Sequence, residues 1–334
     1  MKFTKTLLLA VALSATKIAN AGLIRAKTTA PTRAIYQAQV VTPTPIYAQP
    51  LVPTIDPIVA QPVPYEQPLH LKLGLQLVDE INATHSLGIF EDTEGVQVNN
   101  YGGSWEDDVD PSFIRFFDEG DGILPANNTV CAPFVTHLML HAYDWDWGDY
   151  PFDDPKEGID NNTSESPNPW QYLALVDDNV GFEKKITNIR QSKPGDIISI
   201  HYLDGDSGHT MILVDLHLED PIAYPEAGDN LNPALAGTHF YRMTIMDSTG
   251  SPHTNDTREF TIYDDNDDPT DHEIHGAGIG DMGIFLDING NIIGHTWSLS
   301  PSNPGSQGWI NGMNSRLKLQ TERQMVFGRL PANP

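Results

Sequence analysis

Cysteine is almost absent from this chain of 334 residues, which has only Cys131. The protein therefore cannot form an internal disulfide, although exported proteins that use cysteine structurally normally have an even number of them. A lone cysteine is either a small buried hydrophobic residue or a reactive thiol. Its neighbours in the sequence must decide between these two interpretations.

Basic residues are also scarce, with 19 Lys and Arg against 45 Asp and Glu and a formal net charge of -26. So acidic a surface repels phosphate groups, which argues against a nucleic-acid binder and against a polybasic reader of membranes. We expect partners that are neutral or cationic. No segment approaches the roughly 20 consecutive apolar residues that a membrane-spanning helix needs, so we expect no membrane insertion.

The chain divides into three parts by composition. Residues 1–21 are typical of a secretory signal peptide, with early lysines, a short apolar run and the small residues Ala19 and Ala21 around the cleavage site. Residues 22–70 are predicted to be a flexible Pro-rich linker, because nine prolines lie between residues 31 and 70. Residues 71–334 are globular in composition and show no internal repeat. We therefore expect one domain, secreted or periplasmic.

Within this domain, a helix comes before a series of strands. Helical periodicity predicts a helix over 131–143, with Asn127, Asn128 and Thr129 as candidate N-caps, and a short helix around 170–176. Strand patterns are found at 196–203, 209–218, 240–247, 284–287 and 292–297. The first two should form an antiparallel hairpin, and the Asn-Gly pair at 289–290 predicts a hairpin between the last two. This order predicts an α+β fold.

Cys131 stands at the start of the first of these helices. A helical wheel places it at the head of the buried face with Phe134, Val135 and Leu138. Free backbone N–H groups and the positive end of the helix dipole favour a thiolate there. A thiol nucleophile requires a lowered pKa of this kind.

The matching base is expected from the strands. His209 opens the second strand, and Asp247 ends the third on an apolar face. If these two strands pair antiparallel, the start of one lies beside the end of the other, and His209 and Asp247 become neighbours. A carboxylate beside the imidazole fixes its tautomer and supports its cation, which completes a Cys131, His209, Asp247 set.

Three segments together resemble a known family: VCAPFVTHLM, then KPGDIISI, then SGHTMILVD. They resemble the NlpC/P60 family of papain-like cysteine hydrolases, and more loosely the CHAP amidases, over roughly Thr129 to Ser248. The resemblance implies a papain-like core with the catalytic helix packed on an antiparallel sheet, Cys131 as nucleophile, His209 as general base and Asp247 as the residue that orients it. The family usually has Asp before and Ser after its cysteine, where this chain has Val130 and Ala132.

Other groupings of polar residues remain open. His201 or His253 are alternatives to Asp247, with His253 ranked ahead of His201. His137 and His141 have the i, i+4 spacing of a zinc pair, but no Glu follows His137, and we interpret them as one flank of the helix. The acidic stretches at 204–208, 264–273 and 287–291 do not match a twelve-residue calcium loop, and we interpret them as solvated loops. No metal or cofactor is required.

The sequence thus favours a secreted thiol hydrolase that cleaves an amide bond, with peptidoglycan stem peptides as the substrate class that the resemblance implies. One alternative is an exported binding or interaction protein that keeps the fold without turnover. Another is a thiol acyltransferase. Rapid labelling of Cys131 by a thiol-directed probe would separate an enzyme from a binding protein, since a buried structural thiol reacts slowly.

Overall fold

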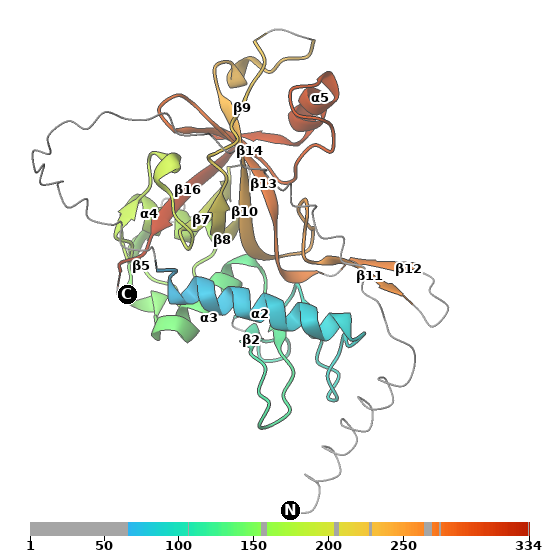
Figure 1. Cartoon of the computed structure of the whole chain (residues 1–334). Coiled ribbons are helices and arrows are strands. Elements are labelled where there is room, and N and C mark those ends of the chain that lie inside the picture. The colour runs from blue at the N-terminus through green and yellow to red at the C-terminus, as the bar shows by residue number, and fades with distance from the viewer. Residues whose placement is uncertain are drawn as a thin grey trace, which may run out of the picture. The chain divides into compact units, whose positions relative to one another are not determined.

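The computed structural model describes most of the chain from Glu66 onward (Figure 1). The described residues are 66–105, 107–154, 159–203, 207–226, 229–263, 269–273, 275–332 and 334. The predicted signal peptide and residues 22–65 of the predicted linker lie outside them. By contacts, Glu66–Ile262 and Pro269–Pro334 form one compact unit.

Four α-helices are found among the described residues: α2 (Leu69–Ser86), α3 (Cys131–Tyr143), α4 (Pro169–Asp177) and α5 (Gln307–Arg316). Short 3-10 turns lie at Trp147–Asp149, Ile189–Gln191 and Pro233–Leu235. No helix of the described residues is long and apolar enough to cross a bilayer.

The main sheet has nine strands in the order β15-β14-β13-β10-β8-β7-β16-β6, with β9 paired to β10. Its strands are β6 (Lys184–Lys185), β7 (Ile197–Tyr202), β8 (Gly208–Leu216), β9 (Ile222–Ala223), β10 (His239–Thr249), β13 (Gly276–Leu286), β14 (Ile292–Thr296), β15 (Leu317–Leu319) and β16 (Arg323–Arg329). Its neighbouring strands all pair antiparallel. The predicted α+β class is therefore confirmed.

Three small sheets accompany the main one. They consist of β1 (Asn99–Asn100), β3 (Ala126–Asn128) and β2 (Phe113–Arg115); β4 (Phe152–Asp154) with β5 (Ile159–Asn162); and β11 (Glu259–Tyr263) with β12 (Pro269–Glu273). The first of these matters for the site, because β3 ends three residues before Cys131.

The elements predicted around the site are confirmed within a few residues. The predicted helix 131–143 is α3, and the predicted short helix around 170–176 is α4. The strands predicted at 196–203 and 209–218 form the β7–β8 hairpin, and β8 pairs antiparallel with β10. The Asn-Gly pair forms the turn between β13 and β14, with Gly290 at a φ of 85°.

Two boundary predictions were wrong. The linker was expected to continue to residue 70, but α2 begins at Leu69, and His70 is fully buried with its Nε2 2.8 Å from the Gly195 carbonyl oxygen. The folded domain therefore includes both residues. Asn127, Asn128 and Thr129 do not cap α3, whose N-cap is Val130 and makes no side-chain cap.

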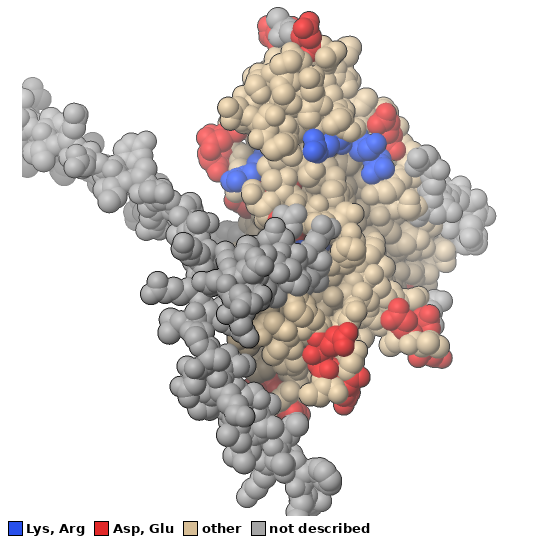
Figure 2. Space-filling view, turned by 90° about the vertical axis from the view of Figure 1, so that its right-hand side faces the viewer, with Lys and Arg blue, Asp and Glu red and all other residues tan. Residues whose placement is uncertain are grey.

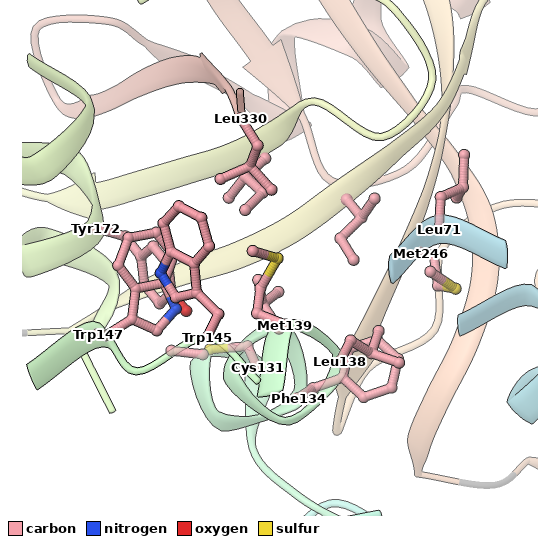
Figure 3. Close-up of a cluster of buried hydrophobic side chains, with 14 of the residues drawn as sticks. Leu71, Cys131, Phe134, Leu138, Met139, Trp145, Trp147, Tyr172, Met246 and Leu330 are labelled. Carbon is pink, nitrogen blue, oxygen red and sulfur yellow. The ribbon is translucent and has the colours of Figure 1, made fainter. Parts of the chain in front are cut away.

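The core lies between the helices and one face of the sheet. Phe134, Leu138 and Met139 of α3 pack there with Leu71 of α2 and Met246 of β10 (Figure 3). Gly74 allows this close approach, since a Cβ at that position would lie 2.2 Å from the Met246 methyl. The side chains on the other face of the sheet form a second apolar cluster, which is drawn from β7, β8, β10, β13 and β16. The central strands are thus buried on both faces and provide a rigid base for the site.

Candidate active site

Cys131 is the first residue of α3, and its side chain is 5% exposed. Val130 before it is extended, with φ -86° and ψ 175°, and its side chain does not cap the helix. The N–H groups of the first turn therefore receive no side-chain cap, and they point toward the same end of the helix as the thiol. Backbone N–H groups placed in this way can stabilise negative charge on sulfur or on a substrate oxygen.

His209, the second residue of β8, lies opposite the thiol and is 3% exposed. Its Nε2 lies 2.6 Å from Oδ2 of Asp247. Because a carboxylate only accepts hydrogen bonds, Nε2 carries the proton, and Nδ1 remains as the nitrogen for the Cys131 thiol. The two side chains lie close enough to shift each other's pKa, and Cys131 Sγ lies 4.0 Å from the carbonyl oxygen of Gly208, the residue before His209.

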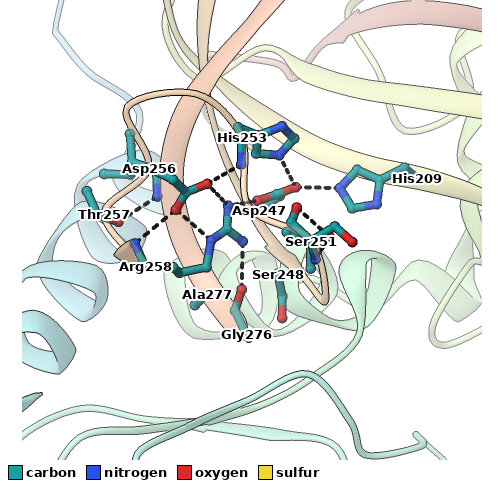
Figure 4. Close-up of polar contacts among 12 residues, drawn as sticks. His209, Asp247, Ser248, Ser251, His253, Asp256, Thr257, Arg258, Gly276 and Ala277 are labelled. Atoms are coloured by element: carbon teal, nitrogen blue, oxygen red, sulfur yellow. Dashed lines mark hydrogen bonds and ion pairs between the residues drawn. The ribbon is translucent and has the colours of Figure 1, made fainter. Parts of the chain in front are cut away.

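Asp247, near the end of β10, is fully buried and has three cationic or donor neighbours (Figure 4). Its Oδ2 accepts from Nε2 of His209 at 2.6 Å and from Nε2 of His253 at 3.0 Å. Its Oδ1 lies 2.9 Å from Nη2 of Arg258, in an ion pair that is not an aligned hydrogen bond. The predicted neighbours His209 and Asp247 are therefore in contact, and His253 joins them from the other side of the carboxylate.

The electrostatics of the site favour an ion pair between sulfur and imidazole. Burial opposes ionisation of Cys131, but the His209 imidazole and the Thr210 backbone N–H outweigh it and lower the thiol pKa. Burial likewise opposes protonation of His209, but Cys131 and Asp247 outweigh it and raise its pKa. For Asp247, burial is outweighed by Arg258, His253 and His209, which hold the pKa of the carboxyl well below its usual value. A thiolate facing an imidazolium is the charge state of a cysteine nucleophile.

A short hydrogen-bond path joins the strand of Asp247 to the segment that leads to Cys131. Ser248 Oγ donates to the Thr129 carbonyl oxygen at 2.6 Å, and Asn127 Nδ2 donates to Ser248 Oγ at 3.4 Å. The segment before α3 is thus bonded to the residue that follows Asp247. This connection fixes the distance between the thiol and the carboxylate.

Trp297, directly after β14, covers both imidazoles. Its ring centroid lies 4.8 Å from that of His209 and 4.2 Å from that of His253. The indole Nε1 donates to the Ser251 carbonyl oxygen at 3.0 Å, which holds the ring in place. An aromatic cover of this kind excludes water and strengthens the charge interactions beneath it.

A cleft of about 930 Å³ opens beside Cys131. Its walls include Trp105, Asp146, Asp149 and Glu165, and none of its described lining residues is a lysine or arginine. Trp105 packs on His137 at 4.6 Å between ring centroids, and its Nε1 lies 3.5 Å from Glu165 Oε2. Cys131 therefore opens onto a polar, acidic cleft.

The other sequence candidates lie outside this arrangement. His137 Nε2 lies 3.0 Å from Ser112 Oγ, and His141 packs edge-on against Phe116. His201 lies on β7, with its backbone paired to Gly208 and Gln324. Among the described residues, no three His, Cys, Asp or Glu side chains are grouped as a metal site would require. Asp287 accepts from the N–H groups of Asn289 and Asn291 and so forms the hairpin turn.

In the sequence His253 is an alternative to Asp247, whereas Arg258 and Asp256 match no motif. In the structure, both Asp247 and His253 belong to the site, since His253 contacts the Asp247 carboxylate that binds His209. Arg258 and Asp256 lie behind them and are 2% and 5% exposed. The available signal was their position: all three follow β10 within eleven residues of Asp247. Their closeness in the sequence does not predict that the Arg258 side chain is buried.

No family model matches the chain. No solved structure matches it either. Over 209 residues the chain is 28% identical to an uncharacterized protein of Acanthamoeba polyphaga mimivirus, in an alignment that spans 60% of this chain and 77% of the viral protein. This likeness indicates a distant relative whose name assigns no activity.

Proposed function

We propose that the protein is a cysteine hydrolase of the papain-like NlpC/P60 type that cleaves an amide bond. The observation that supports this most is the series Cys131, His209, Asp247, in which a thiol at a helix start faces a buried histidine that is bonded to a buried carboxylate. Each group has the partner that its role requires. The packing of α3 on an antiparallel sheet agrees with the core that the sequence resemblance implies.

In the proposed reaction, the Cys131 thiolate attacks the substrate carbonyl carbon while first-turn N–H groups, including that of Cys131, stabilise the oxyanion. His209 then gives its Nδ1 proton to the leaving nitrogen, the C–N bond breaks, and a thioester remains. A water molecule gives a proton back to His209 as its oxygen attacks the thioester carbon, and cleavage of the C–S bond releases the acid and restores the thiolate–imidazolium pair. Asp247 holds the imidazole in place throughout. No metal or cofactor takes part in these steps.

For the substrate class we propose peptidoglycan stem peptides. The family resemblance supports the class, and the charge of the cleft supports peptides that carry a free amine. Asp146, Asp149 and Glu165 line the cleft, and the face in Figure 2 has acidic side chains in several places and basic ones in one band. A protein with a net charge of -26 attracts cationic substrates over a Debye length of about 8 Å at physiological salt. Secretion, as the N-terminal sequence predicts, would bring the enzyme to such substrates.

The direct test is to digest purified cell-wall sacculi and to identify the released fragments by mass spectrometry. We expect stem-peptide fragments from the wild-type protein and none from Cys131→Ala. If the wild-type protein releases nothing from sacculi or peptide amides, and Cys131 reacts with a thiol probe no faster than free cysteine, the binding-protein alternative replaces the enzyme. Transfer of the acyl group to an added amine in preference to water would instead indicate an acyltransferase.

The charge preference has its own test, with a matched control. Glu165 lines the cleft, whereas Glu219 is an exposed glutamate beyond the far end of β8. We expect Glu165→Gln to lower kcat/KM for a lysine-bearing peptide about 2-fold to 5-fold, the effect of an exposed charge pair of up to about 1 kcal/mol. Glu219→Gln should leave it unchanged, and added salt should reduce the difference. Equal effects of the two variants would show that the acidic cleft does not select the substrate.

A further inference from the structure

Behind the proposed catalytic set lies a second group of charges that the reaction scheme does not use. It consists of His253, Asp256 and Arg258, which are 3%, 5% and 2% exposed (Figure 4). All three follow β10 in one loop that folds back against β13. Charged side chains are almost never buried to this extent unless each has a partner.

The ring of His253 faces a hydrogen-bond acceptor at each nitrogen. Nδ1 lies 2.8 Å from the Trp297 carbonyl oxygen, and Nε2 lies 3.0 Å from Asp247 Oδ2. A carbonyl oxygen cannot donate, and Arg258, which lies 2.9 Å from the other oxygen of Asp247, outweighs burial and keeps this carboxylate ionised. Both nitrogens must therefore donate, which makes the His253 ring an imidazolium.

Arg258 provides a second positive charge on the other oxygen of Asp247. Its Nε and Nη2 donate to Oδ1 and Oδ2 of Asp256, both at 2.7 Å, while Nη2 also lies 2.9 Å from Asp247 Oδ1. Its Nη1 donates to the Gly276 carbonyl oxygen at 2.8 Å. Asp256 also accepts from the backbone N–H of His253 at 2.7 Å, so the loop is held at both ends.

β13 leaves room for this group because it carries glycine where the loop packs. A Cβ on Gly278 would lie 2.6 Å from Arg258 Nε, and one on Gly280 would lie 2.7 Å from both Asp256 Oδ2 and the His253 Cβ. Glycine in a strand interior often marks a place where another group approaches closely. The strand and the loop thus fit together around the buried charges.

The charges of the group cancel. Asp247 and Asp256 are negative, while His253 and Arg258 are positive. The charge of Asp247 is therefore already offset before His209 takes up a proton. Without that offset, a bare buried carboxylate 2.6 Å from His209 would hold the imidazolium so strongly that it could not act as a base toward water.

We infer that His253 is a charged positioning residue, which together with Arg258 offsets Asp247 so that His209 can both donate and accept a proton during turnover. The inference about turnover rests on the proposed hydrolase function. The charge state of His253 does not, because it follows from the contacts of its ring. The two can therefore be tested separately.

The groups that face this arrangement come from every element around it. His253 meets Asp247 of β10, the Trp297 carbonyl after β14 and, through its backbone, Asp256. His209 of β8 meets Asp247, Cys131 of α3 and the Trp297 ring. Tyr101 and Tyr172 also lie close enough to interact with Cys131, but burial raises the pKa of both phenols, so they stay neutral. Arg258 faces the other oxygen of Asp247.

The first measurement uses the native full-length protein and needs no substrate. In protein labelled with 15N-histidine, the ring nitrogens of His253, assigned by comparison with His253→Gln, should both show the shifts of protonated nitrogens at neutral pH. A neutral ring with one unprotonated nitrogen would overturn the inference, whatever activity the protein has. If His253→Gln does not fold, His253 can be assigned in the native protein by coupling of a ring nitrogen to the Trp297 carbonyl. This histidine should then show two protonated nitrogens.

The second measurement follows the alkylation rate of Cys131 by iodoacetamide against pH. The chain has one cysteine, so the reaction reports this thiol alone. We expect two steps, for loss of the thiol proton and of the His209 proton. In His253→Gln both should move upward by about one pH unit or more, since removing a nearby positive charge makes each deprotonation harder. Unchanged steps in a folded His253→Gln protein would overturn the inference.

His217 offers a matched control on the same pair of strands. It lies beyond the far end of β8, and its Nε2 lies 2.9 Å from Thr244 Oγ1 of β10. His217→Gln removes a histidine that contacts no member of the site, so its alkylation profile should match that of the wild type. A shift in this variant equal to that of His253→Gln would assign the effect to a general change in the fold and overturn the role of His253. If the wild-type protein hydrolyses no amide but the alkylation profile of His253→Gln is shifted, only the proposed function is refuted.

Discussion

Replacing Arg258 with glutamine should strongly destabilise the fold, although the side chain touches no substrate-facing surface. The substitution removes the cation that holds two buried carboxylates, Asp247 and Asp256, at contact distances of 2.9 and 2.7 Å. Removing one partner of a buried ion pair costs about 3–5 kcal/mol, because the other charge is left in a medium of low dielectric. That is a large part of the roughly 5–15 kcal/mol that stabilises a typical domain.

The assay is urea-induced unfolding at pH 7, followed by tryptophan fluorescence. Arg242→Gln is the control, because Arg242 Nη1 lies 3.7 Å from Asp281 Oδ2 and the arginine side chain is 46% exposed. A surface pair of this kind contributes at most about 1 kcal/mol. The reasoning would be refuted if the two variants lost similar, small amounts of unfolding free energy.

The difference in unfolding free energy between the wild type and Arg258→Gln should also depend on pH. Arg258 helps to hold the pKa of Asp247 well below its usual value in the folded protein. Asp247 therefore contributes stability above its unfolded pKa of about 3.9, and this contribution disappears as pH falls toward the folded pKa. The stability difference between wild type and Arg258→Gln should therefore shrink as pH falls below about 4.

Cys131→Ala and His209→Ala should each abolish amide hydrolysis, and the double variant should be no slower than either single variant. The reason is that substitutions of residues that act as a unit have non-additive effects on the rate. A further loss of rate in the double variant would show that the two residues act independently. His70 is buried and neutral, since burial lowers its pKa to about 4, so it contributes stability above pH 6.5 that is lost as pH falls toward 4. Urea titrations should therefore show that the free energy of unfolding falls less between pH 7 and pH 5 in His70→Gln than in the wild type. Gly278→Ala should cost about 1–3 kcal/mol, because its Cβ would meet Arg258 Nε at 2.6 Å, and an unchanged melting temperature would show that the loop can move away.

Much of the proposed site could be predicted because it depends on two periodic patterns. The helical period placed Cys131 at the head of a buried face, and antiparallel pairing brought the start of β8 beside the end of β10. Once those strands pair, His209 and Asp247 lie side by side. Alternation along a strand and periodicity along a helix are local properties, and the sequence shows them directly.

The parts that could not be predicted depend on side-chain contacts between distant segments. Asn127 and Thr129 look like N-caps, but Asn127 Nδ2 donates to Asn99 Oδ1 and Thr129 Oγ1 donates to Asn127 Oδ1, so their polar atoms are used elsewhere. Arg258 lies in an irregular loop with no periodicity. Its burial depends on Gly278, a residue on a later strand whose missing side chain leaves the space.

The position of β16 has a consequence for how the domain folds. β16 (Arg323–Arg329) lies inside the sheet, between β7 and β6, and Arg329 forms an ion pair with Asp196, 133 residues earlier in the chain. Until β16 has been synthesised, the edge of β7 has no partner, although most of that strand is buried and apolar in the native state. An unpaired apolar edge is a site for association with other chains, and pairing across so long a separation is slow. The growing chain should therefore be most prone to aggregate after β8 and β10 have formed and before Arg323 emerges.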